Sequence, residues 1–551
     1  MHRKHNPLYT SLKQLSATLM MVGATFVAGN AQAQMLEEVV VTAQKRTESL
    51  SDVPISVNVV GADKIANSGI TNLHDMSDFV PNLSMNQTGI GTNITIRGIS
   101  SGINPAFEQS VGMYVDDVYY GRAQLSRMPY LDVARVEVLR GPQPILFGKN
   151  SIAGAISTIT EKANTEETTG FVQGDYNFDQ EGTDISGAAN IAIGDQFGIR
   201  LSGLKRESDG YFENTTLGGR PESSLEEQVL RLSLRWEPTD DLTIDLKREN
   251  SQYDTEGRFL EIVNPVEVGG SPSYADALFG VTGGAVVLDT NQDFNRQSNG
   301  DINETEVDNT TLKIDWLLGD YTLTSITAYV EYEDYQQCDC DFTDAILIDT
   351  SGREEFEQTS QEFRLTSPGG ETIDWIAGAF YQENEVELND LTIVPVGSLL
   401  GGLSAALPGT GARRAYGQES ELWSAFAQVT WNIADDLRLT VGGRYSEEDK
   451  SGFRKIDIVD IVGASPVRDI LGQEPTISPA APPTYAAGFG IDNQQFNLSG
   501  LTDCGGASDA VGHDLACDRD ESKFTPQFNL QWDMNDETML YASYTEGFKS
   551  G

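Results

Sequence analysis

Four cysteines are the residues of this chain whose chemistry depends most on the compartment in which it folds: Cys338, Cys340, Cys504 and Cys517. In an oxidising compartment such thiols form disulfides, and four of them allow three pairings. Cys504–Cys517 closes a short polar loop and is the bridge that we expect. Cys338 and Cys340 would form a tight, strained ring if they paired with each other, so their pairing stays open. A metal site that joins His513 to Cys504 and Cys517 is the alternative, and oxidation favours the disulfide.

Sequence motifs of common enzymes are missing from the chain. It has no nucleophile elbow, no zinc-binding helix motif and no phosphate-binding P-loop. We therefore expect a protein that is not an enzyme and that holds neither a cofactor nor a metal.

The charge balance is strongly acidic, with 83 acidic against 37 basic residues and a formal net charge of −46. Nucleic acid is an unsuitable partner for such a chain, because no basic surface exists to displace counterions. The hydrophobic content of 39% and the mean hydropathy of −0.31 exclude a bundle of membrane helices. They are compatible with a membrane β-barrel, whose strands carry apolar residues at every second position.

The first 33 residues have the pattern of a cleaved secretory signal peptide. Arg3, Lys4 and Lys13 form a positively charged region, residues 15–27 form a short apolar run, and Ala31-Gln32-Ala33 fits the cleavage rule. The apolar run is too short to cross a bilayer as a helix. The pattern predicts export, which places the cysteines in an oxidising compartment.

From residue 167 onward the chain alternates between apolar and polar residues, as strands with one polar face do. Trp423 and Trp431 lie eight residues apart on one face, about 26 Å along a strand or roughly 20 Å in height after tilting. This height nearly matches the apolar band between the aromatic girdles of an outer-membrane barrel. The pattern therefore predicts an antiparallel membrane barrel over residues 167–551, of which we count about thirteen strands by alternation.

Connections between these strands differ in length. Tight polar turns are expected at residues 194–196, 238–241, 319–320, 368–371, 435–436 and 535–537. Long loops are expected within residues 254–304, 387–418 and 449–521. Short turns on one side and long loops on the other are typical of the periplasmic and extracellular edges of a barrel.

Residues 34–166 have a different pattern, with short strands mixed with helix. Strands are expected at residues 52–60 and 93–100, a helix through Leu73, Met76 and Val80, and a hairpin that turns at Asp116-Asp117. Such a mixture predicts one small α/β domain ahead of the barrel.

Residues 131–160 carry a resemblance to a known family. The runs Arg140-Gly141-Pro142-Gln143, Leu146-Phe147-Gly148 and Gly154-Ala155-Ile156 resemble the plug signature of TonB-dependent outer-membrane receptors. Pro144 stands where many members carry Gly, and Lys149 where many carry Arg. The resemblance extends over nearly the whole chain and implies an N-terminal α/β plug inside the barrel. Family barrels have about twenty-two strands, so we expect this chain to be incomplete at its C-terminal end.

The resemblance also implies a partner-binding segment, the TonB box. Glu38, Val39, Val40, Val41, Thr42 and Ala43 form a short β-prone run near the expected mature terminus. Such a segment can add as a strand to the sheet of another protein, here the TonB energy-transducing protein on the periplasmic side. The alternative is that these residues form the first strand of the following domain.

A plug–barrel lock is a further implication of the resemblance. Arg97 and Arg140 lie in motifs that present plug arginines to glutamates of the barrel wall, and Glu362 lies in a strand resembling one that carries such a glutamate. Arginine–carboxylate bonds in a partly dehydrated lumen would hold the plug and still be separable under force. Ordinary lumen charges with water between them are the alternative reading of Glu362.

The resemblance implies active import of a scarce nutrient across the outer membrane of a Gram-negative bacterium. The expected partners are TonB, outer-membrane lipid and a small extracellular ligand such as a metal chelate. A passive porin or a surface adhesion barrel is the alternative of a different class, and the plug discriminates because a porin needs no such domain. Within the importer class, glycan or aromatic-compound uptake is the alternative to iron.

Overall fold

The computed structural model describes residues 40–87, 91–102, 108–263, 272–402, 407–461, 477–479, 515–535 and 538–550. The described residues from Val41 onward belong to one compact unit. Within the described part, no helix is both long and apolar enough to cross a membrane.

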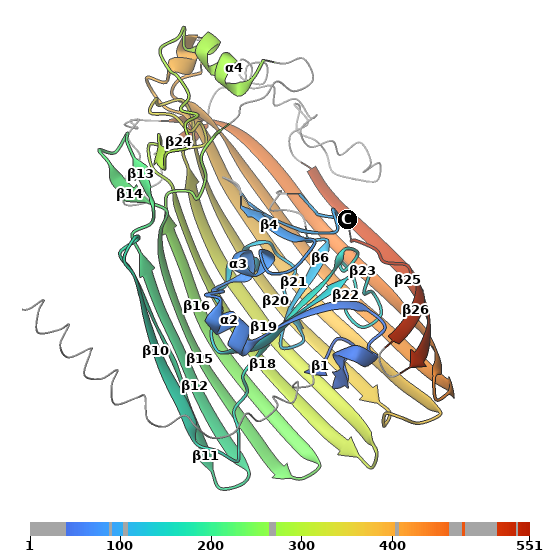
Figure 1. Cartoon of the computed structure of the whole chain (residues 1–551). Helices are drawn as coiled ribbons and strands as arrows, with labels where there is room; N and C mark the ends of the chain where they lie inside the picture. Colours follow the sequence, from blue (N-terminus) through green and yellow to red (C-terminus); the bar gives the residue numbers. More distant parts are fainter. Residues whose placement is uncertain are drawn as a thin grey trace, which may run out of the picture. The chain divides into compact units, whose positions relative to one another are not determined.

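One antiparallel sheet of fourteen strands, called the wall below, dominates the structure (Figure 1). Its strands are β10 (Thr169–Asn177), β11 (Gly182–Ile193), β12 (Phe197–Ser208), β15 (Ser224–Thr239), β16 (Leu242–Glu256), β18 (Ile302–Leu318), β19 (Tyr321–Cys338), β20 (Asp349–Thr366), β21 (Ile373–Val394), β22 (Thr410–Ala434), β23 (Leu437–Ile461), β24 (Ile477–Pro479), β25 (Leu515–Asn535) and β26 (Thr538–Thr545). Thirteen of the described strands follow one another as neighbours in chain order, and β24 pairs with β23 beside that path. This number agrees with the count from alternation.

Alternation places apolar side chains on the outer face of the wall, as predicted. Trp423 and Trp431 on β22 are 46% and 50% exposed, and Phe524 on β25 is also exposed. Ser424 and Gln428, which alternate with them, are buried on the inner face. An outer face of this kind suits lipid, and an inner face of small and polar residues suits a lumen.

Five of the six predicted tight turns connect neighbouring strands, for example β18 to β19 and β22 to β23. The sixth, at residues 535–537, lies mostly outside the described residues. The long connections are shorter than predicted, because β21, β22 and β23 continue well into the expected loops at residues 387–418 and 449–521. Val394 still pairs with Thr410, which pairs in turn with Asp460. Outside the apolar band a strand needs no apolar outer face, so its alternation disappears while its hydrogen-bonded ladder continues.

Small elements occupy the remaining connections. A three-stranded sheet consists of β13 (Phe212–Asn214), β14 (Arg220–Glu222) and β17 (Asn295–Arg296), and one connection contains the helix α4 (Tyr274–Val281) and another the 3-10 turn η4 (Leu399–Gly402).

The N-terminal domain, called the plug below, lies against the inner face of the wall (Figure 1). Its five-stranded sheet has the order β3-β8-β9-β6-β7, and β1 pairs with β2 and β4 with β5 in two-stranded sheets. Its elements are β1 (Val40–Val41), β2 (Glu48–Ser49), η2 (Leu50–Asp52), β3 (Ser56–Gly61), α2 (Ala62–Asn67), α3 (Leu73–Ser77), β4 (Leu83–Gln87), β5 (Thr92–Ile96), β6 (Val111–Val115), β7 (Val118–Tyr119), η3 (Gln124–Arg127), β8 (Val133–Arg140) and β9 (Gly154–Thr160).

The apolar core of the plug continues onto the wall. Val136, Val138 and Ile156 on the central strands β8 and β9 are almost fully buried. The same cluster includes residues of β18, β19, β20 and β21: Val307, Ile326, Ala328, Val330, Tyr332, Phe356 and Val386. These side chains form an apolar seam between plug and wall. Separating plug from wall there would expose their apolar surface to water, which costs free energy.

Gly154 begins β9 at a place where only glycine fits. Its φ is +151°, and a Cβ atom there would lie 2.2 Å from the carbonyl oxygen of Leu139. We expect Gly154→Ala to destabilise the plug by about 2 kcal/mol or more, because the backbone of β8 must shift. Limited trypsin digestion of outer membranes should then cut the plug. Gly174→Ala on β10, where the nearest atom is 4.0 Å away, is the matched control. Equal resistance of the two variants would contradict the prediction.

Candidate functional site

The N-terminal segment, residues 40–48, is docked on the plug. Val41 and Ala43 are 0% and 1% exposed and pack in one cluster with Tyr114, Leu139 and Phe147. The side-chain anchor is Glu137 of β8, whose Oε1 accepts the backbone N–H of Thr42 at 2.8 Å. The backbone that a partner strand would need is therefore engaged inside the molecule.

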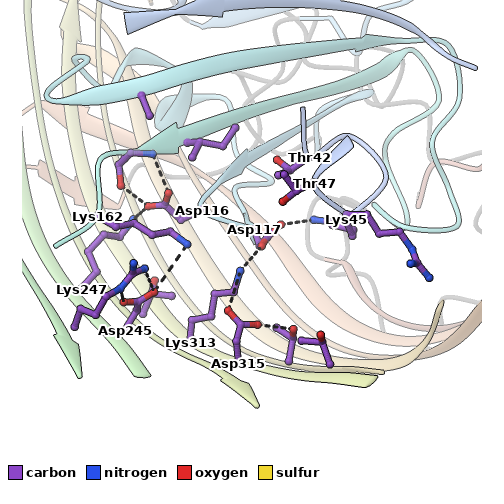
Figure 2. Close-up of a pocket in the computed structure, with 18 of the residues that line it drawn as sticks. Thr42, Lys45, Thr47, Asp116, Asp117, Lys162, Asp245, Lys247, Lys313 and Asp315 are labelled. Atoms are coloured by element: carbon purple, nitrogen blue, oxygen red, sulfur yellow. Dashed lines mark hydrogen bonds and ion pairs between the residues drawn. The ribbon is translucent and has the colours of Figure 1, made fainter. Parts of the chain in front are cut away.

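Lys45 inserts between aromatic rings and a carboxylate. Its Nζ atom lies 2.7 Å from Oδ1 of Asp117, 4.5 Å from the ring centre of Phe147 and 5.5 Å from that of Tyr114. Figure 2 shows the ion pair with Asp117. A cation held by a carboxylate and two ring faces is fixed from several directions, so this side chain fastens the segment to the plug.

Asp116 and Asp117 form the turn between β6 and β7, called the hairpin tip below. Both have left-handed backbone conformations, with φ of 50° and 73°, which aspartate tolerates better than most residues. Asp116 accepts the backbone N–H and the hydroxyl of Thr160 at 2.9 and 2.7 Å. The turn that the sequence predicts thus aims two carboxylates at the wall.

The hairpin tip is bonded to three wall strands. Asp116 binds Lys247 of β16 at 2.5 Å, and Asp117 binds Lys313 of β18 at 3.3 Å and Arg364 of β20 at 3.9 Å. Burial raises the pKa of Asp117, but Lys45, Lys313 and Arg364 outweigh burial and hold that pKa well below its ordinary value. Asp117 therefore stays ionised and joins the N-terminal segment to the wall.

Arg46 makes a second link from the segment to the wall. Its guanidinium donates to the carbonyl oxygen of Ser367 at 2.9 Å and to that of Trp375 at 2.7 Å. Ser367 directly follows β20, and Trp375 lies near the start of β21. The segment is consequently tied both to the plug and to one wall turn.

A cavity of about 1050 Å³ adjoins the segment, the hairpin tip and the wall strands β15 to β20 (Figure 2). Its lining is polar and carries both signs of charge, including Lys45, Asp116, Lys162, Asp245 and Asp315. The volume is that of a small-molecule cleft, although the N-terminal segment forms part of its boundary.

The structure does not bring Arg97 or Arg140 to Glu362. Arg140 donates to the carbonyl oxygen of Pro81 at 3.3 Å and to Oδ1 of Asn58 at 3.1 Å, both within the plug. Arg97 is exposed, and Glu362 is buried and accepts from Arg364 at 2.7 Å.

Sequence reasoning missed the residues that do join plug and wall. Besides the hairpin tip, Arg122 binds Glu354 at 3.0 Å and Arg200 binds Asp132 at 2.6 Å. The adjacent pair Asp116-Asp117 in the expected turn could have indicated a contact between plug and wall, because two carboxylates on a buried hairpin need cationic partners. Of the predicted box, Glu38 and Val39 lie outside the described residues.

The cysteines divide into two cases. Cys338 and Cys340 are bonded to each other, so the ring that we expected to be strained is the pairing that forms. Cys504 and His513 lie outside the described residues. The Cys504–Cys517 bridge therefore stays a prediction.

Asp339, between the bonded cysteines, is a buried carboxyl group in the connection from β19 to β20. Its Oδ2 atom accepts the backbone N–H of Asn299 at 2.6 Å, and Asp341, Asp301 and Asp349 are its charged neighbours. Burial, together with Asp341, raises the pKa of Asp339 to about 9. The group is therefore protonated at neutral pH.

This raised pKa predicts that the connection loses stability with increasing pH. The contribution of Asp339 is fully present below its ordinary value of 3.8 and is lost as the pH rises through about 9, because the unfolded loop ionises first. Hydrogen exchange of residues 338–348, corrected for intrinsic exchange, should show protection falling over this range. Asp339→Asn should flatten the dependence, and an unchanged slope in that variant would contradict the assignment.

Together, the wall, the plug and the docked segment define a plugged membrane β-barrel of the receptor class. The chain matches the family model of the TonB-dependent Receptor Plug Domain over residues 49–155 and that of the TonB dependent receptor-like beta-barrel over residues 247–551. The chain belongs to the TonB-dependent receptors. Members of this family are receptors and transporters and not enzymes.

Individual relatives are distant. The chain is 24% identical to the pesticin receptor of Yersinia pestis over 444 residues, which are 77% of this chain and 58% of that protein. It is 27% identical to the vitamin B12 transporter BtuB of Vibrio vulnificus over 187 residues, which are 33% of this chain and 29% of that protein. The chain therefore spans about 58% of the length of the pesticin receptor that it matches.

Solved structures share the fold. The ferric yersiniabactin uptake receptor FyuA from Yersinia pestis superposes with a TM-score of 0.65 at 17% identity, covering 90% of this chain and 65% of that one. The alcaligin receptor FauA from Bordetella pertussis has a TM-score of 0.57 at 12% identity, covering 93% of this chain and 66% of that one.

Proposed function

We propose that this receptor imports a scarce nutrient, of which a ferric siderophore is the leading candidate, across the outer membrane with energy supplied through TonB. The observation that carries the proposal is the N-terminal segment docked on the plug by Lys45 and Thr42. The ferric yersiniabactin receptor and the alcaligin receptor among the structural neighbours support a siderophore as ligand. In this proposal residues 1–33 are a cleaved export signal, residues 34–166 carry box and plug, and residues 167–551 lie in the outer membrane.

Release of the segment is the first step that the proposal requires. A partner strand can add only to free backbone groups, and the N–H of Thr42 is engaged by Glu137 while Val41 and Ala43 are buried. Force on the released segment then acts on Lys45, and through it on Asp117 and the hairpin tip. The lock of Arg97, Arg140 and Glu362 stays a separate proposal, because Glu362 is paired with Arg364 in this structure and Arg140 is bonded within the plug. The contact through which force reaches the wall is Asp117, which binds Lys313 and Arg364.

A passive porin or an adhesion barrel fits the arrangement less well. The plug places an apolar seam, several buried ion pairs and the docked segment of residues 40–48 inside the wall. A passive pore gains nothing from such a seal, whereas a receptor that opens only under force needs one.

The first test is Val40→Pro, which removes a backbone donor from any strand that β1 could add to another sheet. We expect binding of the purified periplasmic domain of TonB to be lost, and uptake of radiolabelled iron from a panel of ferric siderophores to stop. Val40→Thr, which keeps the donor and the β-propensity, is the matched control. Normal TonB binding by the proline variant would rule out this segment as the handle.

The second test is Lys45→Met, which keeps the length of the side chain but removes its charge. Asp117 retains Lys313 and Arg364, so the plug should stay in place while the segment loosens. We expect the TonB domain to bind the ligand-free receptor about tenfold more tightly, which corresponds to about 1.4 kcal/mol. Surface plasmon resonance measures this affinity, and an unchanged or weaker affinity would show that Lys45 does not restrain the segment.

A further inference from the structure

Lys149 is a buried cation of the plug that binds the wall at a second place, separate from the hairpin tip. Its Nζ atom lies 2.9 Å from Oε1 of Glu108 on the plug and 2.6 Å from Oε1 of Glu448 on β23. Glu448 also accepts the hydroxyl of Ser420 at 2.6 Å. Burial raises the pKa of Glu108, but Lys149 and Lys450 outweigh it and lower that pKa to about 2. The two carboxylates share the ammonium group of Lys149, and Glu448 also lies 3.5 Å from Nζ of Lys450.

The backbone next to Lys149 is held tightly. Gly148 has a φ of +84°, and a Cβ atom there would lie 3.1 Å from the guanidinium of Arg444. The carbonyl oxygen of Gly148 accepts the hydroxyl of Ser151 at 2.7 Å, and that of Phe147 accepts the hydroxyl of Tyr114. Lys149 and Phe147 are thus separated by one residue, in a loop whose carbonyl groups on both sides are hydrogen-bonded.

Phe147, in the same loop as Lys149, contacts the N-terminal segment. Its ring lies under the ammonium group of Lys45 at 4.5 Å, and its side chain packs in the cluster that contains Val41 and Ala43. Two residues of one plug loop thus contact two different parts of the molecule. Lys149 binds the wall, and Phe147 packs against the N-terminal segment.

We propose that Lys149 is a positioning residue for the N-terminal segment: its ion pairs with Glu108 and Glu448 hold Phe147 against Lys45, and weakening them frees the segment. The inference rests on the proposed function only because it takes the N-terminal segment as the part of the receptor that TonB binds. The ion pairs of Lys149 would then regulate the segment, because any change that moves Glu108 or Glu448 away from Lys149 would loosen it.

The test measures release of the segment without ligand and without TonB. Ala43→Cys places a thiol at a position that is 1% exposed, so a maleimide reacts there only when the segment leaves the plug. In outer-membrane fragments we expect Lys149→Met to raise the labelling rate about tenfold, since Glu108 and Glu448 lose the ammonium group that they share and Lys450, 3.5 Å from Glu448, replaces it only in part. Lys149→Arg should restore a rate near that of the parent, because the guanidinium again lies between two carboxylates.

Arg122→Met is the matched control. Arg122 is also a buried plug cation bound to a wall glutamate, Glu354, but its aromatic neighbour Phe356 belongs to the seam and not to the cluster around the segment. The labelling rate of Arg122→Met should stay within about twofold of the parent rate, because Arg122 contacts the seam and not the segment. That result would exclude a general loosening of the plug as the cause of faster labelling in Lys149→Met. The same fragments without the Ala43→Cys change give the background from the native cysteines.

Three results would overturn the proposal: no acceleration in Lys149→Met, equal acceleration in Arg122→Met, or failure of Lys149→Arg to restore the slow rate. Should Lys149→Met not assemble, Glu448→Gln removes one of the two ion pairs of Lys149, with a charge change of equal size and opposite sign, and its labelling must also accelerate. Because the reaction involves neither TonB nor transport, its outcome is separate from that of Val40→Pro, which tests the handle itself.

Discussion

Ionisation of Asp117 inside the barrel lumen is the constraint on which the rest of the arrangement depends. Lys313 and Arg364 project from neighbouring parts of the wall toward one point, and Lys45 approaches the same point from the N-terminal segment. Without a carboxylate there, three closely placed cations would repel one another, and only Arg364 and Lys313 would keep other carboxylates of the described residues, Glu362 and Asp315, beside them. The cations of the wall strands and the carboxylates of the hairpin tip therefore neutralise each other. These ion pairs fix the position of the plug more than they add to the free energy of unfolding.

Apolar and ionic contacts have different roles in this interface. The seam of Val307, Val330 and Phe356 with the plug core is non-directional, and its free energy is lost only as apolar surface becomes exposed. An ion pair such as Asp116–Lys247 depends on exclusion of water, so its attraction weakens sharply once water enters. Water entering the polar cavity beside the segment can thus weaken the ionic links while the seam keeps the plug attached.

Much of this arrangement could be predicted from alternation, turn residues and the plug signature. The outer face of β22, the turn at Asp116-Asp117 and the order of the wall strands follow from local chemistry. The ionic partners do not, because Lys45 and Asp117 are 72 residues apart and Lys149 and Glu448 are 299 apart. Alternation tells which face of a strand a residue occupies but not its height in the lumen, so Glu362 could be placed inside without its partner Arg364 being identified.

The order in which contacts break under force follows from their sizes. The segment is held by two small buried side chains, Val41 and Ala43, by the bonds of Thr42 and by the side chains of Lys45 and Arg46. The seam involves an apolar cluster that spans the plug and four wall strands, and burial free energy grows with the area removed from water. A pull on the terminus therefore detaches the segment before it can displace the plug. Residues with few buried contacts are those that open at low free energy, and here they lie in the segment that we propose as the TonB box.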